Sequence, residues 1–250
     1  MSNLIYDKYE GCGNSFVVID DRALNFPCSD VSLIQKLCHR EGVDGLLLLQ
    51  CDPAAEFRMR IFNADGGEAE ACGNGLRCIA RYMADLGLTP HRIAMGNQVV
   101  EVQFVGDQIA VLCPPPTQLV LSRKVGPWTV HTVNTGVPHA VVFVLDVNAI
   151  DVTKEAPFLR HHPLFAKSGT NVNFVSVDSD RSLVLRTFER GVERETLACG
   201  TGAMAASVVA WALKVAKGPI NCRTRGGVLL IEQNGITGEL KIIGPAGKLA

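Results

Sequence analysis

The chain contains one short segment twice, first as Ala71-Cys72-Gly73-Asn74-Gly75 and again as Ala198-Cys199-Gly200-Thr201-Gly202. Each copy follows a strand-like run that ends near a Phe, at Phe62 and at Phe188, and each opens a run with helical spacing of apolar residues. The stretches from Phe to Cys are nearly equal in length. A Cys at the start of each of two equivalent helices predicts that two sulfur atoms serve one site.

The composition is that of a globular protein with balanced charge. The 250 residues are 47% hydrophobic and 20% charged, with 24 Lys and Arg against 25 Asp and Glu. This length suffices for two cores of ordinary size. No basic stripe occurs, which argues against nucleic acid as a partner. The polar first ten residues and the lack of a long apolar run predict a cytoplasmic protein with no membrane span.

The nine cysteines are an odd number scattered over the whole chain. This pattern differs from the disulfide framework of a small secreted protein, so most of them are predicted to be reduced thiols.

Apolar runs bounded by Gly, Pro and Asp predict a strand-rich protein with three helices. The predicted strands are Ser15–Ile19, Leu46–Leu49, Phe57–Phe62, Val99–Phe104, Gln108–Leu112, Ala140–Leu145, Phe174–Val177, Ser182–Phe188 and Val228–Glu232. The predicted helices are Val31–Arg40, Gly75–Leu86 and Gly202–Val215.

A run of prolines near the midpoint predicts the domain boundary. Cys113-Pro114-Pro115-Pro116-Thr117 cannot continue a strand ladder, because proline lacks the amide donor. We therefore expect domains at 1–115 and 116–250, carrying Cys72 and Cys199 respectively. The helix after Cys199 is apolar almost all round, which implies burial on every side by a surrounding sheet. A weaker echo links Asn14–Asp20 with Val172–Asp178 and favours a duplication, whose pseudo-twofold axis would bring the two helix starts together.

The duplicated cysteines suit acid and base chemistry at one carbon. A Cys in the first turn of a helix is near the positive end of the helix dipole and unpaired amides, which lowers its pKa toward neutrality. The Gly residues that follow allow a ligand to approach the backbone, and the amides form an anion site that could hold a carboxylate. One thiolate and one thiol could then invert the α-carbon of an amino acid without a Schiff-base cofactor.

These residues allow four other interpretations. A Cys before Gly-x-Gly is often only a small residue in a tight turn, but the duplication favours shared catalysis. The spacing of Cys72 and Cys78 matches no common zinc site, so no metal is expected. Gly200 to Ala205 imitates a dinucleotide fingerprint without the required alternation of strands and helices. A redox-sensing module with a regulatory disulfide between Cys72 and Cys199 remains open.

Polar residues at strand ends and in Gly-rich turns gather around the two motifs. Arg and Asn are suited to recognising carboxylate and ammonium groups, although any one of these residues could simply be a turn residue. The set is Asn14, Asn63, Asn74, Asn171, Glu189 and Arg190, and His139 lies in a turn that leads into a strand.

The chain resembles the diaminopimelate epimerase family, whose members convert LL-diaminopimelate to the meso form without a cofactor. The resemblance rests on five blocks spread over nearly the whole length. They are Gly11–Phe16, Phe62–Gly66 with Cys72–Cys78, Asn134–His139, Asn171–Phe174, and Glu189–Gly191 with Ala198–Gly202.

The resemblance implies a role for each matched residue. Cys72 and Cys199 would be the proton donor and acceptor, and His139 and Glu189 would tune the two thiols. The substrate-binding set would be Asn14, Asn63, Gly73, Asn74, Asn171, Glu189, Arg190, Gly200 and Thr201. The implied fold class is α+β, with two pseudo-symmetric domains that are each a barrel-like, mostly antiparallel sheet around a central helix.

The resemblance also implies a biological setting. The substrate would be a small amino acid on the route to lysine and peptidoglycan precursors, and the enzyme would be a homodimer. An alternative is a cofactor-independent racemase of another amino acid, glutamate-like or proline-like, on the same scaffold.

Three departures from the common family pattern put selection of the distal end of the substrate in doubt. Gly45 follows Asp44 where many members have Gln, and Val137 occupies a position where Asn is common. The stretch from Glu189 to Cys199 is one residue longer than in the commonest form.

Overall fold

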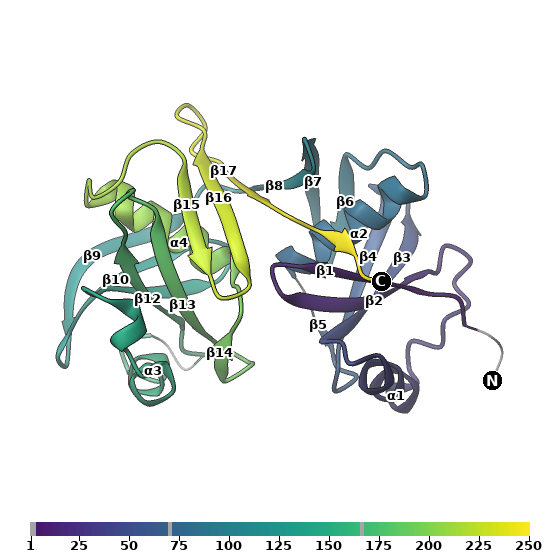
Figure 1. The fold of residues 1–250 in the computed structure, drawn as a ribbon, viewed down its shortest axis with the longest axis horizontal. Helices are drawn as coiled ribbons and strands as arrows, with labels where there is room; N and C mark the ends of the chain where they lie inside the picture. The colour runs from purple at the N-terminus through teal and green to yellow at the C-terminus, as the bar shows by residue number, and fades with distance from the viewer. Residues whose placement is uncertain (1–3, 70–71, 166–167) are drawn as a thin grey trace. The chain divides into compact units, whose positions relative to one another are not determined.

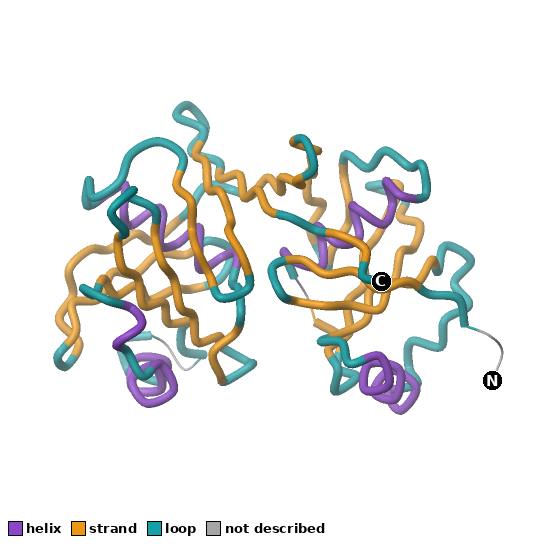
Figure 2. The backbone as a smooth tube through the Cα atoms, viewed as in Figure 1, coloured by secondary structure: helices purple, strands orange, loops and turns teal. Residues whose placement is uncertain are grey.

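The computed structural model describes residues 4–69, 72–165 and 168–250, and it divides into two compact units. The first unit contains residues 1–112 and 243–250, and the second contains residues 113–242. Strands are the commonest regular element in both units, as Figure 2 shows. The described residues contain four α-helices, so the predicted sheet-rich α+β fold is confirmed.

The first unit is built from the chain's first half and its last residues. Its helices are α1 (Val31–Glu41) and α2 (Gly73–Asp85). Its strands are β1 (Asp7–Gly11), β2 (Asn14–Asp20), β3 (Gly45–Asp52), β4 (Glu56–Asn63), β5 (Glu68–Ala69), β6 (Arg92–Met95), β7 (Gln98–Val105), β8 (Gln108–Cys113) and β18 (Gly247–Lys248).

From β10 onward, the second unit has its α-helices and strands in the same order as the first unit has from β1 onward, with one added 3-10 helix. Its helices are α3 (Val152–Arg160), α4 (Gly200–Ala212) and the short 3-10 helix η1 (Val147–Ala149). Its strands are β9 (Thr117–Val125), β10 (Trp128–Asn134), β11 (Pro138–Phe143), β12 (Asn171–Val177), β13 (Leu183–Glu189), β14 (Arg194–Thr196), β15 (Ile220–Thr224), β16 (Gly227–Gln233) and β17 (Leu240–Gly244).

The strand pairings are repeated in the two units. In the first unit β1–β2 is antiparallel, β2–β3 parallel, β3–β4 and β4–β5 antiparallel, and β4–β6 parallel. In the second unit β10–β11, β11–β12, β12–β13, β13–β14 and β13–β15 have the same directions in the same order. The helices also fall at equivalent places, since α1 and α3 each form a parallel crossover. The two units are therefore duplicated in topology.

Each unit has one helix enclosed by strands. The helix α2 packs against β1, β2, β3, β4 and β18, and α4 packs against β10, β11, β12, β13, β15 and β16. In Figure 1 the strands of the second unit surround α4. Every residue of α4 from Gly202 to Ala210 is buried, as its apolar sequence predicts. The helices α1 and α3 pack on separate cores, through residues such as Ile34 and Leu159.

The division of the chain differs from the predicted one at two places. The first change of unit follows Leu112, just before the prolines, whereas the prediction was 115. The last eight residues were predicted in the second domain but belong to the first unit, because β18 pairs with β1. Pairing between strands at the two ends of the chain has no local sequence signal. The prolines mark only the first change of unit and could not indicate the second.

The echo between Asn14–Asp20 and Val172–Asp178 is wrong as a structural equivalence. The first segment is β2, whose counterpart in the pairing order is β11, whereas the second lies in β12, the counterpart of β3. All of these strands have a parallel neighbour and are mostly buried, so their apolar composition is alike without their being equivalent.

Candidate active site

Cys72 and Cys199 have the same local geometry. Each is the N-cap residue of an enclosed helix in an extended conformation, with φ −155° and ψ 109° for Cys72, and φ −125° and ψ 109° for Cys199. The amide of Gly75 donates to the sulfur of Cys72 at 3.3 Å, and the amide of Gly202 donates to that of Cys199 at 3.4 Å. The helix N-terminus and the amide donor both favour a thiolate over a thiol.

The second Gly after each Cys is required by close packing. A Cβ on Gly202 would lie 2.4 Å from the Asn173 side-chain oxygen, and one on Gly75 would lie 3.1 Å from Leu47. By contrast, a Cβ on Gly73 would meet nothing within 4 Å. The first Gly of the segment in α2 therefore leaves the helix start open, and the second Gly brings the helix close to its sheet.

In the first unit, three of the predicted binding residues gather at the start of α2. The thiol of Cys72 lies 3.9 Å from Oδ1 of Asn14, which begins β2. Gly73 is exposed and Asn74 is buried, both in the first turn of the helix. Asn63 is exposed at the end of β4. Ala71, the first residue of the segment, lies outside the described residues.

Arg77 holds the Asn74 side chain, a contact that the sequence motifs did not predict. Its guanidinium is fully buried and donates to Oδ1 of Asn74 at 2.8 Å. It also donates to the carbonyl of Pro245 at 3.3 Å and lies 3.5 Å from the sulfur of Cys12. Arg77 lies one turn after Asn74 on α2, and this spacing is the signal that could have indicated the contact.

In the second unit, Glu189 contacts Cys199 directly. Its carboxylate accepts hydrogen bonds from the Cys199 thiol and, at 2.5 Å, from the Thr196 hydroxyl. Burial raises the pKa of Glu189, and these two hydrogen bonds partly offset that effect. A carboxylate beside a thiol can exchange a proton with it.

Thr201 and Gly200 complete the start of α4. The Thr201 hydroxyl lies 3.4 Å from the sulfur of Cys199, and the Thr201 carbonyl accepts from the hydroxyl of Thr135 at 2.9 Å. A Cβ on Gly200 would lie 2.8 Å from Ile242.

Asn171 fixes the backbone of Arg190. Its side-chain oxygen accepts from the Arg190 amide at 2.8 Å, and its side-chain nitrogen donates to the carbonyl of Pro138 at 3.1 Å. Asn171 begins β12 and Glu189 ends β13. The predicted residues of the second half are therefore joined by hydrogen bonds or by adjacency in the chain.

His139 is held as a neutral imidazole. Nδ2 of Asn173 lies 3.0 Å from Nδ1 of His139 and also donates to the carbonyl of Ala140, so Nδ1 is assigned as the acceptor and Nε2 as the carrier of the proton. Burial lowers the pKa of His139 to about 3. Within the described ranges, Nε2 has no hydrogen-bond partner. Its N–H is therefore able to donate to a bound group.

The structure explains one of the departures from the family pattern. A Cβ on Gly45 would lie 2.5 Å from the carbonyl oxygen of Phe62, because β3 and β4 pair closely there. Any side chain at position 45 would require the strands to move apart. Val137 is half-buried and its carbonyl accepts from the amide of Thr135 at 3.2 Å.

The part of the chain that the structure describes contains no group of three His, Cys, Asp or Glu residues placed to hold a metal ion. Cys78 is buried in α2, and burial raises its pKa.

No described helix combines the length and the apolar character that crossing a membrane would require.

The fold is shared with solved structures described as a phenazine biosynthesis protein and as a probable proline racemase. A phenazine biosynthesis protein of the PhzF family from Bacillus anthracis superposes with a TM-score of 0.74 and 14% identity, over 98% of this chain and 96% of the other. A probable proline racemase from Agrobacterium radiobacter superposes with a TM-score of 0.67 and 14% identity, over 98% and 91% of the two chains. These likenesses define the fold.

The sequence comparisons define the family. The model of the diaminopimelate epimerase family matches residues 6–117 and 131–248. A diaminopimelate epimerase of Chlorobaculum tepidum is 36% identical, over 94% of this chain and 95% of the relative. That of Aquifex aeolicus is 40% identical, over 89% and 87%. The chain belongs to the diaminopimelate epimerase family, as its sequence motifs predict.

Proposed function

We propose that this protein converts LL-diaminopimelate to the meso form by inverting one α-carbon, with Cys72 and Cys199 as the two proton-transfer groups and no pyridoxal phosphate. The single observation that carries the proposal is the identical placement of the two cysteines. In a chain related to diaminopimelate epimerases over nearly its whole length, each Cys caps an enclosed helix and accepts an amide hydrogen bond.

The chemistry requires one thiolate and one thiol. The thiolate removes the α-proton from one face of the carbon, and the thiol delivers a proton to the other face, so the two groups exchange roles when the reaction reverses. Both sulfurs are at helix N-termini, where the dipole and the backbone amides stabilise negative charge. The same amides stabilise the negative charge that develops on the substrate carboxylate.

Glu189 and His139 tune the two thiols in this proposal. Glu189 accepts a hydrogen bond from the Cys199 thiol, so it can take the proton of Cys199 or keep that proton in place. His139 is neutral and offers a buried N–H, which suits donation to a thiolate or to the substrate.

The predicted substrate-binding residues, which again include Glu189, contact the substrate through backbone and side-chain polar groups. Carboxylates suit Arg and backbone amides, and the ammonium groups suit side-chain amide oxygens. The set is Asn14, Asn63, Gly73, Asn74, Asn171, Glu189, Arg190, Gly200 and Thr201.

We further propose a place for this reaction in the cell. The meso product would serve the synthesis of lysine and of peptidoglycan precursors, the enzyme would work in the cytoplasm, and it would form a homodimer. Size-exclusion chromatography with light scattering tests the dimer directly.

The proposed function is tested by incubating dialysed protein with LL-diaminopimelate, without added cofactor, and separating the stereoisomers by chiral chromatography. Formation of the meso isomer supports the proposal, and Cys72→Ala and Cys199→Ala should each abolish it. Parallel incubations with L-glutamate and L-proline test the racemase alternative. Inversion of either of these in place of diaminopimelate would overturn the substrate assignment, and no inversion of any of the three would overturn the enzymatic proposal.

A further inference from the structure

The turn that connects β13 to β14 is anchored from outside by a buried arginine. This turn, residues 190–193, follows Glu189 and begins with Arg190. Arg160, the last residue of α3, donates to Oε1 of Glu193 through Nε at 3.1 Å and through Nη2 at 2.6 Å. We propose that Arg160 and Glu193 form a clamp that positions Glu189 and Arg190, and this inference rests on the function proposed above.

The Arg160 side chain is also held by contacts outside the turn. Its side chain is only 9% exposed, and its Nη1 donates to the carbonyl of Ser168 at 2.9 Å. A Cβ on Gly169 would lie 1.9 Å from Nη1 of Arg160 and 2.3 Å from its carbonyl oxygen. The absence of a side chain at Gly169 therefore makes the space that the guanidinium occupies. A buried guanidinium with one carboxylate partner is a strong and directional contact.

Glu193 forms hydrogen bonds within the turn as well as with Arg160. Its Oε1 accepts from the amide of Gly191 at 2.9 Å, and its own amide donates to the carbonyl of Glu189 at 2.8 Å. Exposed His161 adds a 3.7 Å contact to the other carboxylate oxygen. The backbone of Glu193 is in the left-handed region, with φ 56°, which is unfavourable for Glu and persists only where the surroundings enforce it.

The turn is thus held from two sides. On one side Glu193 is bound by Arg160, and on the other the amide of Arg190 donates to Asn171. These contacts set the direction in which the Glu189 carboxylate leaves β13 toward Cys199. Arg160 and Glu193 contact none of the proposed reacting atoms and are positioning residues.

The test compares Glu193→Ala, Glu193→Gln, Arg160→Ala and the double variant with the wild type. Glu193→Ala should lower kcat for diaminopimelate about 10- to 100-fold, because small misplacements of catalytic groups have effects of that size. Glu193→Gln keeps an oxygen acceptor and should lose much less. Arg160→Ala and the double variant should match Glu193→Ala, because residues that act through one contact are not additive.

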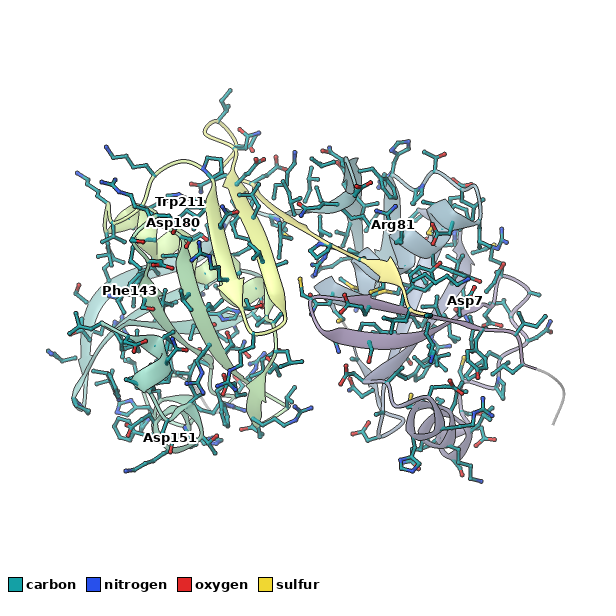
Figure 3. All side chains as sticks on the ribbon, viewed as in Figure 1. Asp7, Arg81, Phe143, Asp151, Asp180 and Trp211 are labelled. Atoms are coloured by element: carbon teal, nitrogen blue, oxygen red, sulfur yellow. The ribbon has the colours of Figure 1, made fainter. Side chains whose placement is uncertain are left out.

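Asp180→Asn is the matched control. Asp180 also pairs with an arginine, Arg223, in the same unit, but it lies in the turn at the other end of β13. Figure 3 shows Asp180 far from Asp151, the N-cap residue of α3. This variant should keep kcat within twofold of the wild type. If Glu193→Ala melts at a temperature close to that of the control, its loss of kcat comes from misplaced residues and not from unfolding.

Three results would overturn the clamp. They are an unchanged kcat in Glu193→Ala, equal losses in Glu193→Gln and Glu193→Ala, and additive losses in the double variant. Hydrogen exchange of the peptide that contains residues 189–196 is a readout independent of activity. Faster exchange in Glu193→Ala supports the clamp and unchanged exchange refutes it, even if the wild type does not epimerise diaminopimelate.

Discussion

At the scale of single residues, the ionisation states of Glu189 and His139 follow from their burial. Burial disfavours the charged form of each, which raises the pKa of Glu189 and lowers that of His139. The pattern of polar residues around the duplicated Cys predicted Glu189, whereas His139 was indicated only by the resemblance to the family. The partners that fix them, Thr196 and Asn173, were not predicted, because they are ordinary strand residues until the register of β12, β13 and β14 is known.

Replacement of Glu189 should act mainly on the chemical step. Gln has the same shape but cannot accept a proton from the Cys199 thiol, so Glu189→Gln should lower kcat about 100- to 10,000-fold, the usual contribution of a positioned acid or base. Steady-state kinetics in both directions provide the measurement. Glu239→Gln, an exposed surface change, is the control, and equal kcat values for the two variants would refute the role.

His139 makes the protein sensitive to mild acid. The unfolded chain binds a proton at His139 below its ordinary pKa of 6.5, whereas the folded protein does so only near pH 3. The free energy of unfolding is therefore unaffected by protonation of His139 above about pH 6.5. It falls as the pH decreases from 6.5 toward 3, by an amount on the order of a few kcal/mol.

Urea unfolding of wild type and His139→Gln between pH 7 and pH 4.5 measures this loss. The wild type should lose more free energy of unfolding over that interval than the variant. The exposed His91→Gln should behave like the wild type. Parallel slopes for wild type and His139→Gln would contradict the assignment.

At the scale of elements, the two capped helices are the features that the sequence predicts best. The start and the apolar surface of α4 follow from Cys199, the glycines and the run after them. The helix α3 was missed because it is short and contains Pro157, which removes a helical amide donor. The strand β9 was missed because its apolar run, Leu119–Leu121, is only three residues long and is flanked by polar residues.

Two glycines of the duplicated segments should differ in how much their replacement by alanine lowers the free energy of unfolding. Gly202→Ala places a Cβ 2.4 Å from Oδ1 of Asn173 and should lower the free energy of unfolding by about 2 kcal/mol or more. Gly73→Ala meets nothing within 4 Å and should leave stability nearly unchanged, even if it lowers activity. Denaturant unfolding of the two variants measures the difference. A destabilisation as large in Gly73→Ala as in Gly202→Ala would contradict the packing described for α4.

At the scale of the whole molecule, the chain's last residues belong to the unit that begins it. The carbonyls of Pro245 and Ala246 accept hydrogen bonds from Arg77 and Arg81 of α2, and β18 pairs with β1. The duplication and the approximate boundary could be predicted from the repeated segment and the prolines. The return of the chain end could not, because it depends on pairing between residues distant in sequence.

Removal of residues 245–250 should therefore weaken the first unit. The buried guanidinium of Arg77 would lose an acceptor, at about 1 to 3 kcal/mol, and β1 would lose its β18 partner. Hydrogen exchange resolved by peptide should show loss of protection in α2 and β1. Loss of protection only in α4 and its surrounding strands would contradict the assignment of the chain end to the first unit.

The proposed mechanism requires two different thiols to act on one carbon. The most direct test is the reaction of LL-diaminopimelate in heavy water, stopped early and analysed by mass spectrometry for deuterium in each stereoisomer. Transfer by two groups predicts one deuterium in the meso product and almost none in the recovered LL substrate. Product that keeps its original proton, or substrate that exchanges as fast as product forms, would show that one group serves both faces and would contradict the two-thiol mechanism.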